Sequence, residues 1–340
     1  MKERIKYIDA LRGFTMLLVV FAHIELLGFG ISPYSSTLGG IFVSFRVPMF
    51  FFISGYIAYK AITWDFGTYI KSVRKKAIVQ LIPTIFFFSL FTFSHMPETG
   101  EEVLQNGWGG YWFTVVLFEF FLIYYTICYF TKQSDIWLIL VSILGIVSLV
   151  LFRNDSVWWN MLCMENVCKY FQFFAFGVLA KKHNERFMGI IRNDIVRACF
   201  IIGFIVCIML VSCTSVCDTF WGKSLIRDIL IRYTGLIVVF SFFMSKEELF
   251  KSEGKFKWVS QSMQYVGRHT LDIYLLHYFF LPTLPVLAGV VRGGAVIELS
   301  VTLIISIIII MITLLVSEVI RSSDFLAHYL FGAKSEKYKI

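Results

Sequence analysis

Long runs of apolar residues, separated by short polar segments, follow one another along almost the whole chain. Each run has roughly 17 to 25 residues, the length with which an α-helix crosses a hydrocarbon core of about 30 Å. We therefore expect an all-α, polytopic bundle of ten membrane-spanning helices. The predicted spans are residues 11–30, 38–60, 77–95, 111–131, 136–152, 164–180, 196–213, 225–244, 269–291 and 296–320.

The composition supports this class of protein. Of the 340 residues, 58% are hydrophobic and only 16% are charged, whereas soluble domains contain about 25% charged residues. No polar stretch between the predicted spans is long enough for a separate soluble domain, so residues 1–340 are expected to form a single transmembrane domain. The first span continues well beyond a signal-peptide core without a small-residue cleavage site, which indicates an uncleaved anchor.

The positions of lysine and arginine predict the orientation, because short cytoplasmic loops carry an excess of both. The N-terminal segment and the second, sixth and eighth loops are basic, whereas the opposite loops hold only Arg153, Lys223 and Arg292. Both termini are therefore predicted to be cytoplasmic. The basic residues are Lys2, Arg4, Lys6 and Arg12; Lys60, Lys71, Arg74, Lys75 and Lys76; Lys181, Lys182, Arg186, Arg192 and Arg197; and Lys246, Lys251, Lys255, Lys257 and Arg268. The net charge of +8 follows from this topology and does not indicate a nucleic-acid partner.

Ionisable residues inside the apolar spans are candidates for function, since a charge at a helix centre costs about 2.5 to 3.5 kcal/mol on translocation scales. Arg12 and His23 are eleven residues apart, which on an ideal helix is three turns plus about 20° and a rise of about 16 Å. They share a face, with Arg12 at the inner rim and His23 within the membrane. Arg46 and Glu119 are predicted at a similar depth to His23.

These four residues have simple structural interpretations as well as a chemical one. Arg12 can be a flank residue that extends to the interface, and His23 can form a hydrogen bond between helices. Chemically, acyl transfer needs a base, a carboxylate that orients it and a cation for the oxyanion. His23, Glu119 and Arg46 are the predicted catalytic residues on that interpretation. A proton-coupled transporter also needs ionisable groups at mid-membrane, so both classes remain open.

A basic cluster of Arg74, Lys75 and Lys76, close to Lys71, precedes the third span. Such a cluster suits the phosphates of a nucleotide-derived donor, although composition alone favours the simpler explanation, the preference for basic cytoplasmic loops. The seven cysteines form no CxxC pair and lie beside no paired histidine, so we expect no metal site.

Three blocks of sequence, in order, resemble the membrane acyltransferase-3 family, in particular its sugar O-acetylases of the fucose-acetylase type. The first is "YIDALRGFTMLLVVFAH", which contains Arg12 and His23 at the family's spacing. The second is "FRVPMFFFISGYI" in the second span, and the third is "RKKAIVQLIP" at the third. Two weaker blocks, "GYWFTVVL" and "LDIYLLH", surround Trp112 and His277.

The resemblance implies an enzyme of the inner (cytoplasmic) cell membrane, with about ten helices. It would move an acyl group, usually acetyl, from cytoplasmic acyl-CoA to a hydroxyl group of a cell-surface or lipid-linked saccharide. It implies His23 as general base, Arg12 as a partner near the donor, and a CoA-phosphate site at Arg74, Lys75 and Lys76. Acetyl-CoA would be the donor substrate, with no permanently bound cofactor. The oxyanion role of Arg46 comes from its predicted depth and not from the resemblance. The alternative, a proton-coupled transporter or flippase of a glycan or small solute, would not bind acyl-CoA.

Overall fold

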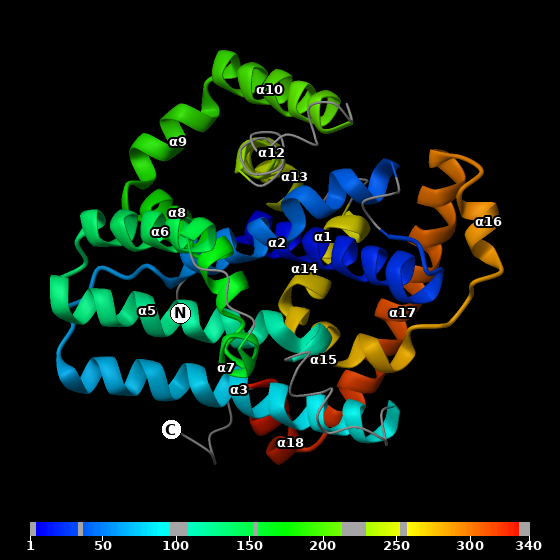
Figure 1. The fold of residues 1–340 in the computed structure, drawn as a ribbon, viewed down its shortest axis with the longest axis horizontal. Coiled ribbons are helices and arrows are strands. Elements are labelled where there is room, and N and C mark those ends of the chain that lie inside the picture. Colours follow the sequence, from blue (N-terminus) through cyan, green and yellow to red (C-terminus); the bar gives the residue numbers. More distant parts are fainter. Residues whose placement is uncertain are drawn as a thin grey trace. The chain divides into compact units, whose positions relative to one another are not determined.

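A computed structural model describes residues 5–32, 37–95, 108–151, 156–212, 229–251 and 257–332. Throughout these ranges the regular structure is helical, and the described part of the chain contains no strand (Figure 1). This confirms the all-α prediction. Helices are the expected result for long apolar runs, because a helix satisfies all its backbone hydrogen bonds within one segment.

The chain divides into two compact units. The first is made of Met1–Ile53 and His183–Leu314, and the second of Ser54–Lys182 and Leu315–Ile340. The divisions fall within helices α2 (Thr37–Ala58) and α17 (Ala295–Arg321), so each of these helices contributes to both units.

The first unit otherwise contains the N-terminal helix and most of the C-terminal half of the chain. Its further elements are α1 (Lys6–His23), η1 (Ile24–Gly28), α9 (Asn184–Arg192), α10 (Asp194–Ser212), α12 (Ile231–Ser245), α13 (Glu247–Lys251), α14 (Lys257–Arg268), α15 (Thr270–Leu276), η4 (His277–Phe280) and α16 (Leu287–Val291). The second unit contains α3 (Phe66–His95), η2 (Gly109–Tyr111), α5 (Trp112–Thr131), α6 (Asp135–Leu151), α7 (Val157–Met161), α8 (Met164–Lys182) and α18 (Asp324–Phe331).

In the first unit, α1 and α14 approach each other closely at two glycines. A Cβ atom added to Gly13 would overlap the carbonyl oxygen of Met263, and one added to Gly267 would overlap that of Asp9. Small residues at a crossing let two helix backbones come together. Because α15 and η4 follow α14, this crossing brings them alongside the rest of α1.

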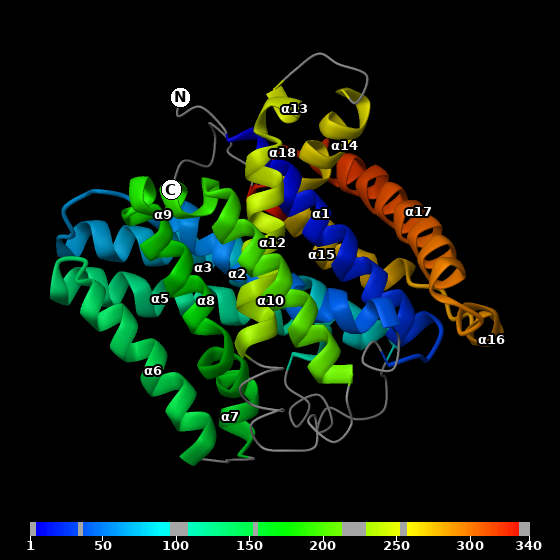
Figure 2. The same ribbon diagram turned by 90° about the horizontal axis from the view of Figure 1, so that it is seen from above.

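In the second unit, α3 and α5 run antiparallel and side by side (Figure 2). Tyr69 contacts Thr126 at one end of the pair, with 3.3 Å between the hydroxyl oxygens. Nearer the other end, the Thr84 hydroxyl donates to Oγ1 of Thr114 at 2.6 Å. Helices α6 and α8 form a second close pair.

The two ends of the second unit differ in chemistry. One end carries the basic residues in the first turns of α3, together with Lys182 in the last turn of α8, which pairs with Asp135. The opposite end carries Trp108 and Trp112 at the start of α5, and Trp159 on α7. The basic end is the one that the charge pattern predicts to be cytoplasmic.

Among the described residues, five helical segments are long and apolar enough to cross a membrane, and a sixth is added if the pair α9–α10, bent by 76°, counts as one span. The five are Lys6–Gly28, Gly39–Ala58, Phe66–Ser94, Gly109–Thr131 and Ala295–Arg321. The total of ten spans and the orientation stay predictions. Of the residues behind them, several lie outside the described residues: Lys2, Arg4, Phe152, Arg153, Cys213, Lys223, Lys255 and the range 225–228.

The ninth predicted span, residues 269–291, is not one continuous helix. Helix α15 continues into the single 3-10 turn η4, which ends at Phe280, and helical structure resumes only at α16. Pro282 explains the break, because proline lacks an N–H donor and disfavours helical backbone at the preceding residue. Leu281 is accordingly extended, with ψ of 117°.

Candidate active site

Two histidines connect α1 to η4 in the first unit. Nδ1 of His23 lies 2.8 Å from Nε2 of His277. The ring planes differ by only 11°, and the ring centres are 5.1 Å apart. Parallel rings in contact through their faces cannot approach closer than about 3.5 Å. The two imidazoles therefore lie edge to edge and share a hydrogen bond close to the plane of both rings.

The hydrogen-bond partners determine which ring nitrogens carry protons. Nδ1 of His277 lies 2.9 Å from the carbonyl oxygens of both Ile273 and Tyr274. Carbonyl oxygens only accept, so Nδ1 of a neutral His277 carries the proton and its Nε2 is an acceptor. His23 must then donate from Nδ1. This assignment leaves Nε2 of His23 unprotonated, with the lone pair that a general base needs.

The two histidines differ in how accessible they are to a ligand. His277 is fully buried, whereas His23 is partly accessible. The hydroxyl group of Tyr278 lies 3.3 Å from Nε2 of His23, in position to donate a weak hydrogen bond. A polar group from a ligand can take the place of this contact at the same nitrogen.

Arg12, nearer the start of α1, bonds to the start of α15, just as His23 at the end of α1 bonds to η4. Its Nη2 donates to the hydroxyl oxygen of Thr270, the first residue of α15, at 2.6 Å. Arg12 and His23 are thus both bonded to the segment that contains α15 and η4. This segment fixes the two predicted residues relative to each other.

Arg46 lies on the part of α2 that belongs to the first unit. Its Nη1 is 3.5 Å from the carbonyl oxygen of Leu18, one and a half turns before His23 on α1. The charge of Arg46 is close enough to act on the His23 ring. The structure therefore brings Arg46 and His23 into one neighbourhood.

Glu119 belongs to α5 of the second unit, so its convergence with His23 and Arg46 stays a prediction. Its Oε2 is enclosed and has no hydrogen-bond partner among the described residues. Its neighbour Cys163 lies before the start of α8; burial first, and the Glu119 carboxylate second, raise the pKa of that thiol to about 12. An enclosed carboxylate oxygen without a partner is rare and calls for a ligand or a catalytic explanation.

The three predicted phosphate ligands also lie in the second unit, on the first turns of α3. Arg74 and Lys75 are exposed. Lys76 is half-buried, and its ammonium group lies 3.5 Å from the centre of the Phe121 ring. Arg74 and Lys75 are accessible to a ligand, whereas Lys76 also packs against α5.

Comparison with known proteins identifies the family. A family model described as an acyltransferase domain matches residues 5–321, nearly the whole chain. The chain belongs to this acyltransferase-3 family. A search of curated proteins and one of solved structures found no match for it.

In this acyltransferase, residue spacing did not reveal His277, Tyr278 and Thr270 as partners of the predicted residues. The signal for His277 was present, because a second histidine within a predicted apolar span is as costly to bury as His23. Spacing cannot pair two residues on different helices. Only the fold places the last turn of α1 against η4.

Proposed function

We propose that this acyltransferase is an O-acyltransferase of the inner (cytoplasmic) cell membrane. It moves an acyl group, acetyl in the first instance, from cytoplasmic acyl-CoA to a hydroxyl group of a cell-surface or lipid-linked saccharide. The choice of acetyl and of a saccharide rests on the resemblance to the fucose O-acetylase branch. Membership of an acyltransferase family favours transfer over the alternative of transport.

The observation that carries the proposal is the bond between His23 and His277, which leaves Nε2 of His23 as an accessible base. The acceptor hydroxyl donates a hydrogen bond to Nε2, and its oxygen attacks the thioester carbonyl as the proton passes to His23. When the tetrahedral intermediate collapses, the C–S bond breaks and the CoA thiolate takes the proton from the imidazolium. The products are the ester and free CoA, and His23 returns to its neutral form.

The charged residues have complementary roles in this proposal. Arg46, near His23, stabilises the oxyanion of the intermediate. Arg12, Arg74, Lys75 and Lys76 bind the donor, whose phosphates suit guanidinium and ammonium groups. Glu119 acts on the acceptor side as a hydrogen-bond acceptor for saccharide hydroxyl groups.

The test is transfer of labelled acetyl from acetyl-CoA to envelope saccharides by the purified protein in lipid vesicles. His23→Ala should lower the turnover number by about 100-fold or more, the usual contribution of a general base. Acetyl-CoA binding should be unchanged. His183→Gln is the matched control, because His183 is an exposed histidine of the same unit. Normal turnover by His23→Ala would disprove the assigned base, and failure of the wild type to bind any acyl-CoA would disprove the proposed function.

A further inference from the structure

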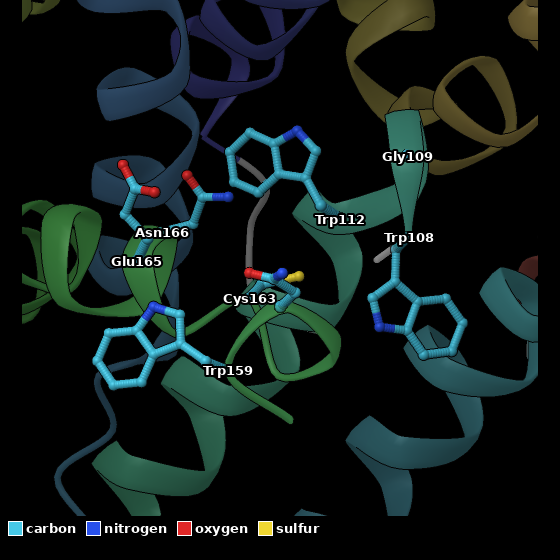
Figure 3. Close-up of a pocket in the computed structure, with 8 residues that line it drawn as sticks. Trp108, Gly109, Trp112, Trp159, Cys163, Glu165 and Asn166 are labelled. Atoms are coloured by element: carbon cyan, nitrogen blue, oxygen red, sulfur yellow. The ribbon is translucent and has the colours of Figure 1, made fainter. Parts of the chain in front are cut away.

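A cavity of about 240 Å³ opens at the tryptophan-rich end of the second unit (Figure 3). Three indole rings, from Trp108, Trp112 and Trp159, contribute to its walls. Its polar lining includes the amides of Asn160 and Asn166 and the carboxylate of Glu165. Figure 3 shows Trp112, Trp159 and Asn166 arranged around Cys163, which lies between α7 and α8.

The walls of this cavity are held in place by the protein itself. The indole N–H of Trp108 donates to the carbonyl oxygen of Met161 at 2.7 Å. Trp112 stacks on Tyr170 with 5.9 Å between ring centres. Cys163 has a left-handed backbone with φ of 47°, and this turn between α7 and α8 lets residues of both helices face the same cavity.

The lining selects one chemical class of ligand. The C–H groups on one face of a pyranose ring pack well against flat aromatic faces, whereas its hydroxyl groups need both donors and acceptors. Side-chain amides supply both, and a carboxylate accepts. The eight lining residues include no lysine or arginine, so the cavity is unsuited to the phosphates of CoA. It is also smaller than the roughly 300 to 1,000 Å³ of sites for drug-sized ligands, which suits a single sugar ring.

We propose that this cavity binds one neutral sugar ring of the acceptor saccharide, with Trp159 as a stacking surface; the identity of the ring as an acceptor rests on the proposed function. The cavity lies at the end of its unit opposite the basic residues of α3. An acceptor from outside the cell and a donor from the cytoplasm would thus bind to opposite ends. Glu119, seven residues after Trp112 on α5 and near Cys163, places an enclosed carboxylate next to this end.

Tryptophans are also common at membrane interfaces, where they anchor helices in the headgroup region. The present arrangement differs because tryptophans from two segments, the start of α5 and the helix α7, border one cavity that is also lined by asparagine and glutamate side chains. Trp158 provides the contrast. It lies next to Trp159 on α7, is 74% exposed and does not line the cavity. A substitution of Trp158 therefore tests a role in membrane anchoring, whereas a substitution of Trp159 tests ligand binding.

The experiment compares Trp159→Ala and Trp159→Phe with the control Trp158→Ala, in full-length protein in lipid vesicles. The acceptor is the saccharide fraction extracted from the envelope of the host, at varied concentration, with labelled acetyl-CoA. Trp159→Ala should raise the acceptor KM by about tenfold, as expected on loss of an aromatic stacking surface. The KM for acetyl-CoA should stay unchanged, which also shows that the variant is folded. Trp159→Phe should be intermediate, and Trp158→Ala should match the wild type.

A calorimetric titration with the same saccharide fraction, without acetyl-CoA, separates this proposal from the proposed function. Saturable binding to the wild type that Trp159→Ala loses supports the cavity as a sugar site, even for a protein that transfers no acetyl. Conversely, acetyl transfer with an unchanged acceptor KM in folded Trp159→Ala would overturn the sugar site and leave the proposed function standing. Absence of saccharide binding by the wild type would overturn the sugar site as well.

Discussion

His277 accepts a hydrogen bond from His23 across 254 positions of sequence and thereby determines which nitrogen of His23 can act as a base. The carbonyl oxygens of Ile273 and Tyr274 keep the proton of His277 on Nδ1. The ring can therefore only accept from His23. His277 is a positioning residue in this arrangement, because it acts through His23 and is itself fully buried. Enzymes commonly control the tautomer of a histidine through the hydrogen bond at its other nitrogen.

Replacement of His277 should reduce turnover more than substrate binding. His277→Phe keeps a flat ring of similar shape but leaves Nδ1–H of His23 without its acceptor. We expect the turnover number to fall by about 10- to 100-fold, the usual cost of losing an orienting partner, with the KM for acetyl-CoA unchanged. His277→Gln, whose amide oxygen can accept from His23, should restore part of the activity. Steady-state kinetics of both variants measure the effect.

The control for His277 is His269→Gln, because His269 pairs with Asp272 through a contact that glutamine can replace. Nitrogen NMR of labelled histidines gives an independent test. It should show His23 protonated at Nδ1 in the wild type and a mixture of tautomers in His277→Phe. An unaltered His23 spectrum together with a reduced turnover would assign His277 a merely structural role.

The sequence predicted the parts of this site that lie on one helix. Arg12 and His23 are related by the period of α1, and their distance in sequence was sufficient to place them on a common face. The pairing with Thr270 and His277 depends on the close crossing at Gly13 and Gly267, which hydropathy does not encode. The ninth predicted span likewise has a break that its hydropathy does not show. Pro282 and Pro285 mark this break in the sequence, but they lie within an apolar run of membrane-spanning length. Residue spacing also cannot bring together Glu119 and His23, which belong to different helices.

The glycine crossing should be intolerant of even one added methyl group. Gly267→Ala places a Cβ atom onto the carbonyl oxygen of Asp9, and this backbone cannot move without separating α14 from α1. We expect a loss of about 1 to 3 kcal/mol in stability, the usual cost of overpacking, and a lower melting temperature in detergent. Acetyl transfer should also fall, because α14 leads into the segment that holds Thr270 and His277.

Gly189→Ala is the matched control for the crossing. Gly189 is an exposed glycine inside α9, and an added Cβ atom there meets nothing within 4 Å. The control should be neutral or more stable by up to about 1 kcal/mol, because alanine favours a helix over glycine. Equal melting temperatures for Gly267→Ala and the wild type would show that α1 and α14 are not in close contact.

The hydrogen bond between Arg12 and Thr270 should contribute more to binding of the acyl-CoA donor than to the chemical step. Thr270→Val has almost the same shape but cannot accept from the guanidinium, so the orientation of Arg12 is lost while its charge remains. We expect the KM for acetyl-CoA to rise by about three- to tenfold, as for loss of a hydrogen bond to a charged group. Thr234→Val is a suitable control, because it makes the same substitution in the same unit, at a hydroxyl that donates to the backbone carbonyls of Leu230 and Ile231 at the start of α12. A fall in turnover with an unchanged KM would place Arg12 in the reaction step instead.

The exposed pair Arg74 and Lys75 should contribute most of the electrostatic attraction for the donor phosphates. The double variant Arg74→Glu with Lys75→Glu leaves Lys76 on the Phe121 ring, so the contact between α3 and α5 is kept. Its dissociation constant for acetyl-CoA should rise by about tenfold or more at low ionic strength, and less at high salt, where exposed charges are screened.

The matched control for this donor site is Arg192→Glu with Lys246→Glu. Both residues are exposed, both follow spans whose ends are predicted to be cytoplasmic, and the change in net charge is the same. A loss of affinity in the α3 variant alone would assign the phosphates to Arg74 and Lys75. Equal losses of affinity in the two variants would mean that the basic residues attract anions in general and form no specific phosphate site. Unchanged affinity in both would mean that the donor phosphates bind elsewhere, and that the basic start of α3 serves only the orientation of the chain in the membrane.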